Sequence, residues 1–145
     1  MTTQQLPPAG TLPREDNLLL STLLNFAQSH HERLADQAAD LGLTVPQAKV
    51  LYFVESAPTV RKLAVKLRCD ASYVTGLVDR LEEQKLMKRQ VDPADRRVKM
   101  LTLTAAGRRL RGKVIRIMDD APGLELLTEK EKLLLGELLK KASAN

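Results

Sequence analysis

The stretch from Leu86 to Thr104 constrains the fold of this chain more than any other part of the sequence. Two strand-like runs, approximately residues 86–91 and 97–103, flank a tight tip with the sequence Asp-Pro-Ala-Asp at 92–95. Short runs of this kind around a Pro/Asp turn predict a β-hairpin. Arg96 and Arg97 follow the tip at once. A hairpin with arginines at its end is typical of a structure that inserts these side chains into a groove of a binding partner.

Segments with helical periodicity precede and follow the hairpin. Threonine or aspartate stands at four expected helix starts, where such residues cap the first turn: Thr44, Thr59, Asp70 and Thr128. Thr44 with Gln47, and Thr128 with Glu131, have the spacing of a capping box. Apolar spacing predicts helices over 14–41, from Thr44 to Pro58, from Thr59 to Leu67, from Asp70 to Gln84, from Thr104 to Ala121 and from Thr128 onward. Only two or three residues separate the third and fourth helices, which is the spacing of a helix-turn-helix. The predicted fold class is therefore mainly α with a small β-hairpin wing (α+β), a winged helix-turn-helix.

Composition excludes several other classes of protein. The chain has 145 residues, enough for one well-cored domain. A single cysteine, Cys69, excludes an intrachain disulfide and a cysteine-rich zinc module. No run reaches the roughly 18 apolar residues of a membrane span, and the N-terminus lacks the features of a signal peptide. We expect a cytoplasmic protein without a membrane partner.

The apolar stripes of the terminal helices indicate a homodimer. We expect residues 1–13, with three prolines, to form a flexible arm and residues 14–145 to form a single domain. Within that domain, residues 44–103 suffice for a winged-helix lobe. The helices at 14–41 and 104–142 also have apolar faces, and few residues of the same chain remain to bury those faces. Exposed stripes of this size usually mark a partner surface. The alternative is that these helices fold back over their own lobe.

Positive charge concentrates in the middle of the chain. Residues 59–113 hold 15 Lys/Arg against 6 Asp/Glu, a balance of +9, whereas the rest of the chain holds 8 against 12. Such a cluster is either an electrostatic footprint for phosphate or an ordinary solvated surface. Its coincidence with the third and fourth helices and the hairpin favours the footprint. The predicted phosphate contacts are Arg61, Lys62, Lys66, Lys88, Arg89 and Lys99.

The helix from Asp70 to Gln84 has an outer face suited to the major groove of DNA. Opposite its buried stripe lie Ser72, Tyr73, Gly76, Asp79, Arg80 and Glu83, with Thr75 on the flank. Small and polar residues allow a helix to enter a groove about 12 Å wide. Gly76 indicates close approach, either by DNA or by a neighbouring helix. Arg80 has two readings as well, a contact to a guanine edge or phosphate and a salt bridge to Glu82 or Glu83.

The hairpin tip predicts a second contact. Asp95 lies two residues before Arg97, so in a strand both side chains would share a face and Asp95 would hold Arg97 extended. A positioned arginine suits the narrow minor groove of A·T-rich DNA. The alternative is a surface ion pair worth less than about 1 kcal/mol. With Arg96 beside it, the tip location favours the functional interpretation.

Other reactive residues do not assemble into a catalytic or metal site. Cys69 is interpreted as a buried structural residue rather than a redox sensor. His30 and His31 point about 100° apart on a helix, so they cannot grip one metal by themselves. We place His31 in the dimer stripe and leave His30 partly exposed; either is a candidate for lining an effector pocket. No nucleophile–base set or phosphate-binding glycine loop is present in the sequence, so an enzyme is not expected.

Several linked motifs resemble the MarR (multiple antibiotic resistance regulator) family over residues 40–110. The motifs are Leu43-Thr44-x-x-Gln47, Leu63-Ala64, Ser72-x-Val74-Thr75-Gly76-Leu77-Val78-Asp79-Arg80-Leu81-Glu82, Asp92-Pro93-x-Asp95-Arg96-Arg97 and Leu103-Thr104-x-x-Gly107. The resemblance implies an obligate dimer that binds palindromic operators, with the recognition helix in the major groove and Arg97 in the minor groove. It also implies that a small, often phenolic or anionic, effector releases the DNA. One departure is Lys85, where the family usually has glycine after the recognition helix.

The sequence thus predicts a homodimeric regulator that binds double-stranded DNA, most often a repressor in such a family, with no cofactor beyond a small effector. The leading alternative is a winged-helix module that binds another protein. RNA binding is disfavoured because aromatic residues for base stacking are scarce, at 3% of the chain.

Overall fold

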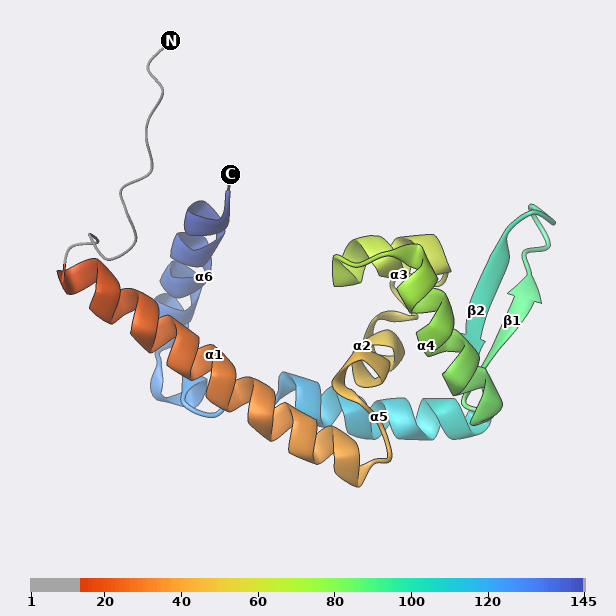
Figure 1. The fold of residues 1–145 in the computed structure, drawn as a ribbon, viewed down its shortest axis with the longest axis horizontal. Helices are drawn as coiled ribbons and strands as arrows, with labels where there is room; N and C mark the ends of the chain where they lie inside the picture. Colours follow the sequence, from red (N-terminus) through yellow and green to blue (C-terminus); the bar gives the residue numbers. More distant parts are fainter. Residues whose placement is uncertain (1–13, 145) are drawn as a thin grey trace, which may run out of the picture. The chain divides into compact units, whose positions relative to one another are not determined.

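The computed structural model describes residues 14–144, so the expected arm at 1–13 lies outside the described part. The elements, in chain order, are α1 (Arg14–Asp40), α2 (Val45–Phe53), α3 (Val60–Leu67), α4 (Ala71–Glu83), β1 (Met87–Val91), β2 (Lys99–Leu103), α5 (Ala105–Asp119), the 3-10 turn η1 (Leu124–Leu126) and α6 (Glu129–Ser143) (Figure 1). This order confirms the predicted mainly helical winged-helix fold. Contacts divide the chain after Arg33, within α1, and each unit is described by itself.

The first unit consists of the N-terminal part of α1. Most of its large apolar side chains are exposed, namely Leu18, Leu19, Leu20, Leu24 and Phe26, whereas Leu23 is half-buried. His31, which the sequence placed in the apolar stripe, is exposed, and His30 is half-buried. The helix ends one residue earlier than predicted, and Gly42 follows it with a φ of +72°. Glycine adopts this left-handed backbone without steric cost, which explains the stop.

Three of the four predicted caps are present. Thr44 and Gln47 form the expected capping box, with the Gln47 N–H donating to Thr44 Oγ1 at 3.4 Å and the Thr44 N–H donating to Gln47 Oε1 at 2.9 Å. Thr59 and Thr128 accept equivalent bonds at the starts of α3 and α6. Asp70 stands at the cap position of α4, but its side chain accepts no capping bond, so that part of the prediction was wrong. The backbone of Asp70 is extended as a cap requires, and its carboxylate remains exposed.

The second unit contains a core built almost wholly from aliphatic residues. Helices α2, α3, α4 and α5 contribute fully buried side chains, and so does Val54, which directly follows α2. The fully buried helical residues include Leu51, Leu63, Val74, Val78, Leu81 and Val114. Met87, Leu101 and Leu103 attach the base of the hairpin to the same core. Gly107 marks the tightest contact, because a Cβ there would lie 1.8 Å from the carbonyl oxygen of Leu86. No other residue fits between α5 and the segment that leads into β1.

The hairpin is a two-stranded antiparallel sheet that pairs Met87 with Leu103 and Val91 with Lys99. The second strand begins at Lys99 rather than at residue 97, because two backbone bonds close a turn across 92–98. The Asp92 N–H donates to the Val98 carbonyl at 2.9 Å, and the Val98 N–H donates to the Asp95 carbonyl at 2.9 Å. The tip is therefore wider than a two-residue hairpin loop.

Polar contacts join α2 to α5. The Arg111 guanidinium donates to the carbonyl oxygens of Leu51 at 3.0 Å and Tyr52 at 3.3 Å, and pairs with Glu55 at 2.9 Å. The Tyr52 hydroxyl donates to Asp119 Oδ1 at 2.7 Å. That hydrogen bond is the main cause that raises the pKa of Tyr52 above its ordinary value. These bonds fix the C-terminal end of α2 on α5, where helix carbonyls lack partners of their own.

No residue of α6 is buried, and its leucines at 133, 134, 138 and 139 are exposed. The alternative that the terminal helices cover their own lobe would require these side chains to be buried, so it is wrong for α6. Within residues 14–144, no helix is both long and apolar enough to cross a membrane.

Candidate nucleic-acid interface

Helix α4 separates its residues into a buried and an exposed face as the sequence predicted. Val74, Leu77, Val78 and Leu81 are buried. The predicted contact residues are all exposed: Ser72, Tyr73, Thr75, Gly76 and Arg80. The apolar face fixes α4 rigidly on the core, because four buried side chains each remove a large apolar area from water. The outer face is thereby held in one orientation.

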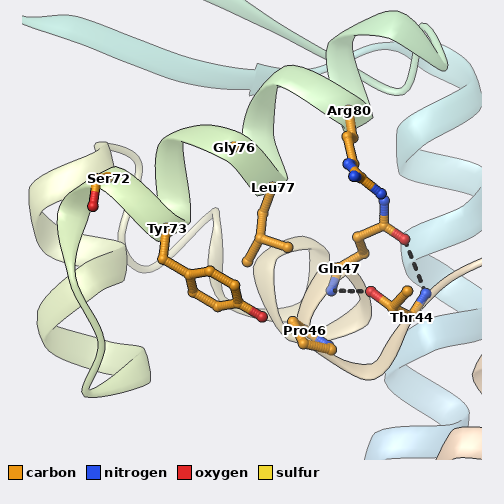
Figure 2. Close-up of a pocket in the computed structure, with 8 residues that line it drawn as sticks. All are labelled: Thr44, Pro46, Gln47, Ser72, Tyr73, Gly76, Leu77 and Arg80. Atoms are coloured by element: carbon orange, nitrogen blue, oxygen red, sulfur yellow. Dashed lines mark hydrogen bonds between the residues drawn. The ribbon is translucent and has the colours of Figure 1, made fainter.

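Four of these residues meet the start of α2 at a shallow hollow of about 460 Å³. Its lining comprises Thr44, Pro46, Gln47, Ser72, Tyr73, Gly76, Leu77 and Arg80 (Figure 2). Tyr73 and Arg80 extend from α4 toward the first turn of α2, and Gly76 lies between them on the helix. Gly76 and Arg80 also border a second hollow with Asp79, Glu83 and Gln84. The structure thus gathers four of the five predicted base-contact residues around one opening, and Thr75 lies outside this lining.

Gly76 has no packing role within the described chain. A Cβ placed there would meet no atom within 4 Å, so the neighbouring-helix explanation for this glycine is wrong. Glycine in a helix interior costs about 1 kcal/mol relative to alanine. No contact inside the lobe offsets that cost.

A third hollow, also of about 460 Å³, lies between α3, α4 and the hairpin. It is lined by Thr59, Val60, Arg61, Thr75, Arg89, Arg97, Val98, Lys99 and Leu101. The hollow brings together five predicted contacts: Arg61 of α3, Thr75 of α4 and, from the hairpin, Arg89, Arg97 and Lys99. The Thr75 hydroxyl donates to the Ala71 carbonyl at 2.9 Å, so its oxygen retains acceptor capacity toward the hollow. Lys62 is exposed on α3, and Arg96 is exposed on the hairpin turn, outside this lining.

The predicted role of Asp95 as a partner of the Arg97 guanidinium was wrong. Asp95 Oδ1 instead accepts a hydrogen bond from the backbone N–H of Arg97 at 3.0 Å. Among the described residues no ion pair joins the two side chains. The physical reason is that residues 95–97 form a turn rather than a strand, so the two side chains do not share a strand face. Asp95 therefore fixes the backbone from which Arg97 projects.

Arg89, predicted to contact phosphate, is occupied within the protein. Its guanidinium pairs with Asp79 at 2.7 Å and with Glu82, and its backbone N–H donates to Glu82 at 2.8 Å. Arg89 consequently ties β1 to the outer face of α4. The expected alternative, a salt bridge from Arg80 to Glu82 or Glu83, does not occur among the described residues: Glu82 is engaged by Arg89, and Arg80 is exposed. Sequence reasoning missed this link because seven and ten residues separate Arg89 from its partners, across a turn.

Two backbone positions near the interface are strained. Lys85, where the family usually has glycine, has a φ of +57° after α4, a left-handed backbone that costs a non-glycine residue roughly 1 kcal/mol. Arg68, which ends α3, has a φ of +52° and was not anticipated. Lys66 lies 5.2 Å from the centre of the Phe53 ring, a cation–π contact, so it is less available to phosphate than predicted.

The remaining candidates stay without an assigned role. Cys69 is half-buried rather than buried. In the described part of the chain, no three His, Cys, Asp or Glu side chains lie close enough to hold a metal ion.

Comparisons with known proteins agree with this geometry. A sequence model of the MarR family matches residues 41–98. The chain is 29% identical over 129 residues to the transcriptional regulator HosA of Escherichia coli O111:H-, covering 86% of this chain and 94% of HosA. It is 31% identical over 101 residues to the regulator MgrA of Staphylococcus aureus, covering 68% of this chain and 69% of MgrA.

A solved structure extends the likeness to three dimensions. The crystal structure of CouR from Rhodococcus jostii RHA1, bound to p-coumaroyl-CoA, superposes with a TM-score of 0.75 and 29% sequence identity, covering 90% of this chain and 93% of CouR. The fold is a winged helix-turn-helix with an arginine-bearing wing, the class of a DNA-binding regulator. The chain belongs to the MarR family of transcriptional regulators.

Proposed function

We propose that two copies of this chain bind one palindromic DNA operator and repress the adjacent gene. The observation that carries the proposal is that one rigid lobe presents both the exposed outer face of α4 and the arginine-bearing wing. A recognition helix of this kind enters the major groove, and a flanking arginine suits the minor groove. As a regulator of chromosomal genes, the protein would act in the cytoplasm.

Each contact has a proposed role. Arg61 and Lys62 at the start of α3 contact phosphates and set the register on the duplex. On α4, the residues that face the bases are Ser72, Tyr73, Thr75, Gly76 and Arg80. On the wing, Asp95 shapes the turn, Arg96 contacts phosphate, and Arg97 enters the minor groove.

The proposed dimer explains the apolar faces that the single chain leaves exposed. Leucines of α6 and of the N-terminal part of α1 are solvent-exposed in the described chain. Exposed rows of large apolar side chains are rarely left open in water. A second copy related by a twofold axis would cover such a row by symmetric packing. The same axis would present two lobes to a palindrome.

Release by a small molecule is a further part of the proposal. CouR was crystallised with p-coumaroyl-CoA, an anionic thioester of a phenolic acid. We expect the effector of this chain to be a small phenolic or anionic compound as well. Its addition should lower operator affinity without unfolding the protein.

Selection of bound sequences from a random duplex pool tests the proposal. We expect a palindrome whose half-sites lie about one helical turn, roughly 10 bp, apart. Enrichment of no duplex sequence, together with capture of one protein partner, would favour the rival interpretation of a protein-interaction module. Preference for single-stranded RNA competitors over duplex DNA would also contradict the proposal.

A further inference from the structure

Neither packing nor backbone conformation within the lobe accounts for the glycine at position 76 of the interface. Two properties usually account for a glycine, a tight contact or a left-handed backbone. Gly107 shows the first, because a Cβ there would collide with the Leu86 carbonyl. Gly42 shows the second, with its φ of +72°. Gly76 shows neither: it lies inside α4 with ordinary helical geometry and nothing within 4 Å of its Cβ position.

The surroundings of Gly76 define what can approach it. Tyr73 precedes it by three residues and Arg80 follows it by four, so both lie on the same side of the helix as Gly76. Their side chains reach toward α2 and border the hollow, with Pro46 opposite and Leu77 at its inner wall (Figure 2). The rings of Tyr73 and Pro46 and the bare helix backbone present carbon atoms to an incoming group. At this point the surface is a small apolar recess, flanked by the positive charge of Arg80.

Only one group on the major-groove edges of the bases matches an apolar recess. Guanine, adenine and cytosine present hydrogen-bond donors and acceptors there, whereas thymine also presents its C5-methyl group. A donor or acceptor placed against carbon would lose its bond to water without replacement. A methyl group would instead be removed from water at no polar cost.

We propose that Gly76 is a specificity-determining residue that admits the methyl group of a thymine in each half-site. This inference rests on the proposed function, because it names the base read by one point of the same surface. Any side chain at position 76 would occupy the space of the methyl group. The glycine is thus retained for close approach of the helix backbone to the duplex.

The experiment combines a base change with a residue change. The selected operator is synthesised with each thymine replaced in turn by deoxyuridine, which removes only the methyl group. Binding of each duplex is measured for the wild-type protein, for Gly76→Ala and for Gly112→Ala. Gly112 is the matched control, an exposed glycine of α5 whose Cβ position is also without neighbours within 4 Å.

For the wild-type protein, one deoxyuridine position per half-site should weaken binding about fourfold, the factor that burial of one methyl-sized group supplies. In Gly76→Ala the new methyl group occupies the recess. Binding to the thymine operator should therefore fall, and the preference for thymine over deoxyuridine at that position should vanish or reverse. Gly112→Ala should keep the wild-type preference. Both variants should melt at or above the wild-type temperature, since alanine favours helix, so lost binding cannot be ascribed to unfolding.

Two results would overturn the inference while leaving the proposed function intact. One is a specific operator in which no deoxyuridine substitution affects affinity. The other is a Gly76→Ala protein with unchanged affinity and an unchanged preference for thymine. If no duplex is selected at all, the proposed function fails and this inference fails with it.

Discussion

Leucine recurs at helical spacing both in the winged-helix lobe and in helix α6, but it is buried in the lobe and exposed in α6. Leu51, Leu63 and Leu81 of the lobe are completely buried, whereas Leu134 and Leu138 of α6 are more than half exposed. The lobe closes on itself because three helices and a hairpin bring apolar faces from several directions. Helix α6 has an equivalent stripe and no buried residue. An amphipathic pattern therefore predicts a helix and its apolar side, while the cover for that side depends on other elements or another chain.

The largest expected effect belongs to the lobe. Leu81→Ala should lower the free energy of unfolding by about 2–5 kcal/mol, because it leaves a cavity in a fully packed core. Urea denaturation at several protein concentrations measures this change. The loss should be equally large at every concentration, since the contact lies within one chain. A loss below about 1 kcal/mol would mean that the core relaxes around the site.

A smaller effect, of about 2 kcal/mol in the free energy of dimerisation, is expected from Leu138→Ala in α6. Its leucine is covered only if a second copy binds, so the cost should appear as dissociation rather than as loss of the lobe's fold. Sedimentation over a range of concentrations measures it, with Glu137→Ala, an exposed neighbour, as the control. If the wild-type protein sedimented as a monomer at every concentration, the proposal that a second copy covers α6 would be wrong.

Arg97→Ala should weaken operator binding about tenfold, equivalent to about 1.4 kcal/mol, and leave the dimer and the melting temperature unchanged. The arginine is exposed on the wing and holds no part of the core. Gel-shift titration at fixed salt measures the change. Arg116→Ala, an exposed arginine of α5, is the matched control and should bind normally. An equal loss in both variants would indicate a general charge effect rather than a wing contact.

Lys85→Gly should raise the free energy of unfolding by about 1 kcal/mol, because glycine tolerates the left-handed backbone at this position. Thermal melting of the lobe measures the gain. The adjacent Gln84→Gly is the control: Gln84 has a φ of −75°, so glycine there should only add flexibility to the unfolded chain and destabilise. Stabilisation by both substitutions would show that strain at Lys85 is not the cause.

The smallest effect concerns pH. The pKa of Tyr52 is raised in the folded protein, chiefly by its hydrogen bond to Asp119. A raised pKa means that the folded state favours the protonated hydroxyl, so its contribution is complete below the unfolded pKa and is lost as pH rises through the folded value. The lobe should therefore lose less than about 1 kcal/mol of stability in alkaline solution. Urea unfolding as a function of alkaline pH measures this loss, which should be absent in Tyr52→Phe.

Local signals in the sequence were sufficient for most of the fold. The capping pairs of Thr44 with Gln47 and Thr128 with Glu131 depend on neighbours three residues apart, and both formed as predicted. The exposed face of α4 followed from helical periodicity alone. The turn at 92–98 was harder, because its closure depends on backbone bonds across several residues. Because of this turn, Asp95 binds the backbone N–H of Arg97 instead of its guanidinium.

Contacts between elements account for what sequence reasoning missed in the site. Arg89 was indistinguishable from the other cations of the hairpin until the fold placed it beside Asp79 and Glu82. Lys66 was similarly assigned to phosphate before the packing of α3 brought it to the Phe53 ring. Both cases have one origin: a charge pattern counts cations, whereas their availability depends on the groups that other elements bring near them.

By itself, the sequence determined the helices, the hairpin, the apolar face of each helix and the family of the protein, since these depend on spacing and on neighbouring residues. Only the tertiary structure decided which cations remain available at the interface, how the wing turn holds Arg97 and that Gly76 faces open space. Those properties depend on distances between residues far apart in the chain, which no local pattern of residues specifies.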